Sequence, residues 1–263
     1  MDLRNRVVAL LVGIGVLLLS ILLAELMTIP VFFIDPAAVP IDPDNATRLG
    51  VMLVITLNFI GLGAGAAVYL YKTDRGWDWL DLHRPGKWDI VWMVGGTIIT
   101  FIALIIVSIL AFSIDADPPE QSTIMIIRED TVLIIFMLLT VWILNAPAEE
   151  LLFRNVIQKR LYSAFSGVAS VIIASLLFAG IHVLTFVLVG TSLIDVLVPI
   201  LGIFIGSIVM GYAYWRTKNL WVPIVIHGLF NSIQISLLLL ARILDIEEGD
   251  MAASAFYLLS VIG

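Results

Sequence analysis

Two adjacent carboxylates, two histidines and an asparagine stand within stretches of sequence that are otherwise strongly apolar. They are Glu149, Glu150, His182, His227 and Asn231. A carboxylate beside an imidazole can take a proton from water, and an imidazole with a carboxamide can hydrogen-bond to a developing oxyanion. These residue types could together activate a water molecule and hydrolyse a polarised bond.

The spacing around the two carboxylates separates their roles. Glu150 and Arg154 are four residues apart, so on a helix they share one face and can form an ion pair, whose simplest role is to lock the helix. Glu149 points about 100° away and has no partner on its own helix. An unpaired carboxylate facing a bundle interior is a candidate general base. Pro147, just before it, predicts a kink.

The histidines show the same four-residue spacing, because Phe178 precedes His182 and Asn231 follows His227. Taken alone, each pair is more often a packing contact or an interhelical hydrogen bond. The helical rise gives a further condition. The three clusters can meet only if the hairpin around residues 163–167 extends about 12 Å further than the turn before His227. We therefore expect residues 155–160 to form a protruding amphipathic extension.

Other hydrolytic centres find less support in the sequence. It contains no H-E-x-x-H and no G-x-S-x-G, the signatures of the commonest zinc proteases and of many serine hydrolases. It also contains no cysteine, which excludes a thiol nucleophile, a zinc–thiolate site and any disulfide.

The elements that position these residues are membrane helices. The chain is 61% hydrophobic and 13% charged, its mean hydropathy is +1.09, and several apolar runs exceed the roughly 18 residues that span a bilayer. We expect one all-α polytopic membrane domain, 1–263, of about seven or eight transmembrane helices. The expected spans are 7–34, 49–71, 89–113, 131–154, 166–189, 193–215 and 220–242. Residues 251–263 are short for a span and predict an interfacial or packed half-helix.

Basic residues predict the orientation. With the N-terminus in the cytoplasm, ten Lys and Arg residues fall in cytoplasmic segments and three in outer ones. We therefore expect an integral, multi-pass protein with a cytoplasmic N-terminus, in a prokaryotic cell membrane. The expected partners are membrane lipids and no nucleic acid.

The three motifs resemble those of a known family. E-E-L-L-F-R matches E-E-x-x-x-R, F-A-G-I-H matches F-x-x-x-H, and H-G-L-F-N matches H-x-x-x-N. In this order the chain, over about 130–240, resembles the CPBP family of CAAX proteases and bacteriocin-processing or immunity proteins, also called the Abi family. The resemblance implies an all-helical intramembrane endopeptidase with a polar cavity open to the cytoplasm.

Carried over by position, the resemblance implies that Glu149 with His182 activates water. His227 and Asn231 would stabilise the oxyanion, and Glu150, Arg154 and Phe178 would support the site. We favour no cofactor, because a carboxamide suits an oxyanion hole better than a zinc shell. Zinc on Glu149, His182 and His227 remains the alternative.

The substrate and the class of function stay open. A peptide or a lipidated protein is the expected substrate. A non-catalytic immunity or partner-binding protein could use the same cavity, and a proton-coupled transporter is a third reading. The transporter is disfavoured because no repeat-related second set of polar residues occurs.

Overall fold

The chain forms a bundle of long apolar helices. The computed structural model describes residues 3–42, 44–116, 122–187 and 193–244. Within that part, six helical stretches are long and apolar enough to cross a membrane. They are α1 (Leu3–Phe32), α2 (Arg48–Lys72), α3 (Lys87–Ser113), the continuous stretch Thr131–Leu161, α9 (Leu193–Thr217) and α10 (Trp221–Ile243). With α8 (Gly167–Val187) as a further apolar helix, the prediction of an all-α polytopic bundle is confirmed. The half-helix predicted at 251–263 lies outside the described residues.

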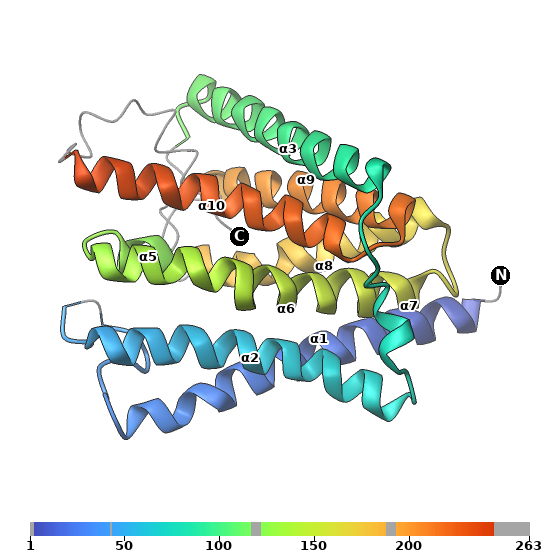
Figure 1. The fold of residues 1–263 in the computed structure, drawn as a ribbon, viewed down its shortest axis with the longest axis horizontal. Helices are drawn as coiled ribbons and strands as arrows, with labels where there is room; N and C mark the ends of the chain where they lie inside the picture. The colour runs from blue at the N-terminus through green and yellow to red at the C-terminus, as the bar shows by residue number, and fades with distance from the viewer. Residues whose placement is uncertain (1–2, 43, 117–121, 188–192, 245–263) are drawn as a thin grey trace.

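The stretch Thr131–Leu161 lies in the middle of the bundle. It comprises α5 (Thr131–Thr140), η2 (Val141–Asn145), α6 (Ala146–Glu150), η3 (Leu151–Gln158) and α7 (Lys159–Leu161). In Figure 1 it runs between the α1–α2 pair on one side and α3, α9 and α10 on the other. It contacts α1, α2, α8, α9 and α10, so side chains on its several faces can meet partners from most of the bundle.

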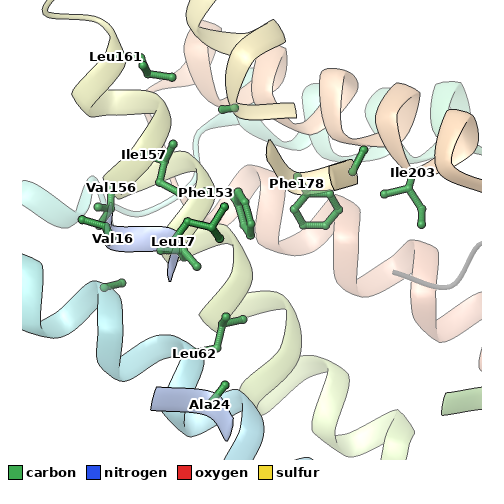
Figure 2. Close-up of a cluster of buried hydrophobic side chains, with 14 of the residues drawn as sticks. Val16, Leu17, Ala24, Leu62, Phe153, Val156, Ile157, Leu161, Phe178 and Ile203 are labelled. Atoms are coloured by element: carbon green, nitrogen blue, oxygen red, sulfur yellow. The ribbon is translucent and has the colours of Figure 1, made fainter. Parts of the chain in front are cut away.

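Apolar side chains from four other helices surround η3. Phe153, Val156 and Ile157 of η3 pack with residues of α1, α2, α8 and α9, as Figure 2 shows. The labelled partners are Val16, Leu17, Ala24, Leu62, Phe178 and Ile203. Between helices in lipid such contacts act through close packing rather than through removal of apolar surface from water. The core therefore fixes the position of the carboxylate-bearing helix.

Two π-helical segments flank the carboxylates. Both η2 and η3 are π-helices, and the amide of Ala146 donates to the carbonyl of Val141, five residues earlier. Pro147 follows this wide turn inside a continuous helix. Because proline cannot donate and its ring collides with the preceding turn, a wider turn next to it relieves the conflict. π-Helical turns are rare and occur frequently at functional sites.

The segment expected to protrude is instead part of the packed bundle. The helix continues to Leu161, and the side chains of Asn155 and Gln158 are fully buried. Asn155 donates to the carbonyl of Trp79 and to the Tyr214 hydroxyl, and Gln158 donates to the carbonyl of Gly211. The polar residues that suggested exposure are thus satisfied inside the protein.

The extra length of about 12 Å expected for this hairpin is therefore wrong. Lys218, in the turn between α9 and α10, has its ammonium 4.2 Å from the ring centre of Tyr162, in the hairpin after α7. The two turns thus end beside each other. The π-helical η3 offers a physical reason, because a wider turn takes up more residues over the same length.

Loop 73–86 crosses the same end of the bundle, and it includes η1 (Trp77–Leu80). Lys159 donates to the Trp79 carbonyl at 2.6 Å and to the Asp81 carboxylate at 2.7 Å. The Tyr214 hydroxyl also donates to Asp81, and the amide of Leu220 donates to the Asp81 carbonyl. Through these contacts the loop joins η3 and α7 to α9 and α10 at this end of the bundle.

Candidate active site

Glu150 joins three helices through one buried carboxylate. Its Oε2 accepts a hydrogen bond from Arg154 Nε at 2.7 Å, and its Oε1 lies 3.0 Å from His227 Nδ1. Arg154 also donates from Nη2 to Ser207 of α9 at 3.0 Å. All four side chains are at most 1% exposed. The ion pair expected from the i,i+4 spacing is present, and it serves as a link between helices as well as a lock within one.

Glu149 points to the other side of the same helix turn. Its Oε1 accepts from Asn145 Nδ2 at 2.8 Å. Its Oε2 is buried and has no hydrogen-bond partner among the described residues. Burying an ionised oxygen without a partner is costly, so the site has capacity for a further donor at this atom.

The unpartnered oxygen of Glu149 faces an unpartnered nitrogen. His227 Nε2 lies 4.0 Å from Glu149 Oε2, and within the described part of the chain it too has no hydrogen bond. The separation is too long for a direct hydrogen bond. A water molecule at about 2.8 Å from each atom would satisfy both, with an angle at the water of about 90°. This is the geometry of a bridged water between a carboxylate and an imidazole.

His227 is oriented by its other nitrogen. Because a carboxylate only accepts, the Nδ1–H of His227 donates to Glu150, and this contact directs Nε2 toward Glu149. Glu150 therefore sets both the tautomer and the direction of the imidazole.

The ring of Phe178 packs against the rings of both histidines. Its ring centre is 4.8 Å from that of His182 and 6.3 Å from that of His227. The Nδ1–H of His182 donates to the Phe178 carbonyl at 2.8 Å, which leaves Nε2 for its other interactions. His182 thus contacts Phe178, and the joint action of Glu149 and His182 that the family resemblance implies stays a prediction.

Asn231 joins the cluster through Asn145, a residue to which the sequence analysis gave no role. Its Nδ2 donates to Asn145 Oδ1 at 3.1 Å. Beside Asn231 and His227 lies a cavity of about 20 Å³, enough for one water molecule. Its other lining residues are mostly apolar and come from α3, α8, α9 and α10. The family resemblance implies a polar cavity open to the cytoplasm, whereas this cavity is small and lined mostly by apolar residues.

Asn145 and Ser207 are the two site residues that sequence interpretation missed. Asn145 carried a signal, because it stands four residues before Glu149 as one of the few polar residues of its run. Ser207 carried none, since serines occur in many membrane helices and only the fold brings it to Arg154.

The alternative zinc site, made of Glu149, His182 and His227, is not assembled among the described residues. The bond from His182 Nδ1 to the Phe178 carbonyl is compatible with a metal bound at Nε2, so it does not decide against zinc. Within the described residues, no group of three or more His, Asp or Glu side chains is arranged to hold a metal ion. We therefore derive no chemical step through a metal.

Comparison with known proteins identifies the same segment. Residues 131–233 match the family model described as "Type II CAAX prenyl endopeptidase Rce1-like". The membrane-embedded CAAX protease MroQ of Staphylococcus aureus (strain USA300) is 29% identical over 157 residues, which are 58% of this chain and 59% of that protein. The match thus spans less than two thirds of the relative's length, and no solved structure matches the chain. The matched segment contains all seven residues singled out by the three motifs.

Proposed function

We propose that this chain is an intramembrane endopeptidase of the CAAX protease type that uses Glu149 as its general base, and the family match over residues 131–233 supports the proposal. The observation that carries the proposal is the gap between Glu149 Oε2 and His227 Nε2. Two buried polar atoms 4.0 Å apart, each without a hydrogen bond among the described residues, suit a water molecule held for attack.

In the proposed reaction, the Glu149 carboxylate takes one proton from this water as its oxygen attacks the carbonyl carbon of a peptide bond. The carbonyl oxygen becomes the oxyanion of a tetrahedral intermediate. Glu149 then gives the proton to the departing nitrogen, and the carbon–nitrogen bond breaks. The products are a carboxylic acid and an amine, and Glu149 returns to its starting state.

Asn231 and His227 are the proposed donors to the oxyanion. The amide nitrogen of Asn231 lies in the same cluster as the base, because it donates to Asn145, which in turn donates to Glu149. His227 donates from Nε2 when its ring carries both protons, a state in which Glu149 and Glu150 balance the charges of His227 and Arg154. Such donors act strongly in a poorly hydrated site because little else screens the charge.

His182 takes a supporting place in this proposal. Its ring packs against the ring of Phe178, which also contacts His227. The bond from its Nδ1 to the Phe178 carbonyl fixes the orientation of the ring. We propose that it assists the water or the substrate from that side, as the family resemblance implies.

The substrate we propose is a peptide segment that is embedded in the membrane or anchored to it by a lipid. The site is enclosed by helices that are long and apolar enough to span a bilayer. A substrate that already resides in the membrane reaches such a site without crossing from water. The family match supports a prenylated peptide as the first probe.

The test uses the purified full-length protein in lipid nanodiscs. Two probes are offered, a quenched fluorescent peptide with a prenylated cysteine three residues from its end, and an unlipidated peptide library analysed by mass spectrometry. We expect cleavage of at least one probe by the unaltered protein and a loss of about 10²–10⁴-fold in Glu149→Gln, the range for a general base.

The matched control is Asp44→Asn, which changes an exposed carboxylate in the loop between α1 and α2. It should cleave at the normal rate. Cleavage by Glu149→Gln at the normal rate would contradict the proposed base. An unaltered protein that cleaves nothing, while a cellular effect persists in Glu149→Gln, would favour a non-catalytic partner-binding protein.

A further inference from the structure

Asn145 contacts two residues of the proposed catalytic site at once. It lies at the end of the π-helical η2, and its side chain is 1% exposed. Its Nδ2 donates to Glu149 Oε1 at 2.8 Å, and its Oδ1 accepts from Asn231 Nδ2 at 3.1 Å. One carboxamide therefore joins the carboxylate on α6 to the carboxamide on α10.

The chemistry of the carboxylate fixes the orientation of both amides. Glu149, when ionised, only accepts hydrogen bonds, so the nitrogen of Asn145 must face it. The oxygen of Asn145 must then face Asn231, and only the nitrogen of Asn231 can donate to that oxygen. The direction of each amide thus follows from Glu149, with no alternative arrangement that keeps both bonds.

This orientation matters for each of the two groups. The bond from Asn145 occupies Oε1 of Glu149 and so leaves Oε2 as the atom that faces His227. The bond to Asn231 holds its donating nitrogen on the side of the cluster where the carboxylate lies. A 1 Å misplacement of a catalytic group can cost about a hundredfold in rate, so a shared anchor of this kind has a direct kinetic consequence.

We propose that Asn145 is a positioning residue that holds the Glu149 base and the Asn231 oxyanion donor in register. The proposal rests on the proposed peptidase function, because it assigns Asn145 to that same reaction. Asn145 itself needs no contact with the substrate. Asn145 stands four residues before Glu149 across the α-helical turn of α6, so the two side chains share one face.

The test compares Asn145→Leu with Asn155→Leu in nanodiscs, with the two peptide probes described above. Leucine has nearly the shape of asparagine but cannot form either hydrogen bond. Asn155 is the matched control, because it is also fully buried, lies on the same continuous helix and donates two hydrogen bonds away from the carboxylates. Both variants should lose similar thermal stability. Only Asn145→Leu should lose kcat, by about 10- to 100-fold, with KM nearly unchanged.

A double variant separates positioning from general damage. If Asn145 acts through Asn231, then Asn145→Leu should slow an Asn231→Ala protein far less than it slows the unaltered protein. If Asn145→Leu does not fold, Asn145→Asp replaces it. This variant keeps the acceptor for Asn231 and removes the donor to Glu149, so its kcat should still fall at least tenfold.

The possible failures are distinguishable. A normal kcat in Asn145→Leu or Asn145→Asp, with Glu149→Gln inactive, overturns the positioning role and leaves the proposed function standing. Equal losses of kcat in Asn145→Leu and Asn155→Leu, or additive losses with Asn231→Ala, also overturn it. Normal cleavage by Glu149→Gln, or no cleavage by the unaltered protein, overturns the proposed function and this inference with it.

Discussion

The carboxylate of Glu150 lies 3.0 Å from Nδ1 of His227, seventy-seven residues further along the chain. The same carboxylate accepts from Arg154, so it binds a guanidinium group of its own helix and an imidazole of α10. Of the two adjacent glutamates, Glu150 is the one whose oxygens both have protein partners. The pair thus divides into a glutamate that builds the site and a glutamate that is left to act in it.

Replacement of Glu150 should therefore damage the fold more than replacement of Glu149. Glu150→Gln removes the charge that compensates the fully buried Arg154, and breaking a buried ion pair in this way costs about 3–5 kcal/mol. Glu149→Gln keeps an acceptor for Asn145 and leaves the Glu150–Arg154 ion pair intact, so its loss should be much smaller. Thermal unfolding of the two variants in the same detergent measures the difference. Equal losses would show that Glu150 is no more structural than Glu149.

The relationships that the sequence predicted are those within one helix. The Glu150–Arg154 pair, the Phe178–His182 contact and the shared burial of His227 and Asn231 all follow from a spacing of four residues. The helical class and the positions of the spans follow from uninterrupted apolar runs, which only a helix can carry across lipid.

What the sequence could not predict depends on contacts between distant segments or on departures from the regular helix. The approach of Glu149 to His227 depends on helix packing, and the burial of Asn155 and Gln158 depends on partners in loop 73–86 and α9. The π-helical turns changed the vertical position of each residue, so a calculation with a constant rise gave the wrong hairpin length.

The close approach of α1 and α2 should be sensitive to a single methyl group. A Cβ at Gly61 would lie 2.5 Å from both Ala24 Cα and the Leu23 carbonyl oxygen, so backbone would have to move. We expect Gly61→Ala to lower stability by about 1–3 kcal/mol, the usual cost of overpacking.

Gly63→Ala is the control for that substitution, because its new methyl would meet only the Ala148 Cβ at 3.5 Å. Alanine also favours a helix over glycine by about 1 kcal/mol, so Gly63→Ala should be neutral or slightly stabilising. Unfolding temperatures of both variants in detergent decide the matter. A destabilisation by Gly63→Ala as large as that by Gly61→Ala would mean that helix packing is not the cause.

The loop between α1 and α2 should carry an acid-sensitive contact. Hydrogen bonds from the hydroxyl and the backbone amide of Thr47 lower the pKa of Asp35 below its usual value. Because the folded pKa is lower than the unfolded one, the contact stabilises the protein above the unfolded pKa and loses this contribution as the pH falls through the folded pKa. Thr47→Val removes the hydroxyl, which also accepts from the Gly50 amide at the start of α2, so it should lower the unfolding temperature at both pH values and by more at pH 7 than at pH 3.

Asp44→Asn is the control in this pH series, because Asp44 is exposed in the same loop. Its unfolding temperature should follow that of the unaltered protein at every pH. If the deficit of Thr47→Val stayed constant from pH 7 to pH 3, the ionised carboxylate of Asp35 would not be what the hydroxyl stabilises.

Removal of metal should leave the proposed peptidase active. Within the described residues, no group of three or more His, Asp or Glu side chains is arranged to hold a metal ion, and the proposed reaction takes its base from Glu149 alone. We expect cleavage to continue after dialysis against a zinc chelator. The matched comparison is the same preparation with zinc returned, which should not be faster. Stoichiometric zinc in the purified protein, with cleavage lost on chelation and restored by zinc, would contradict this prediction and favour Glu149, His182 and His227 as the ligands.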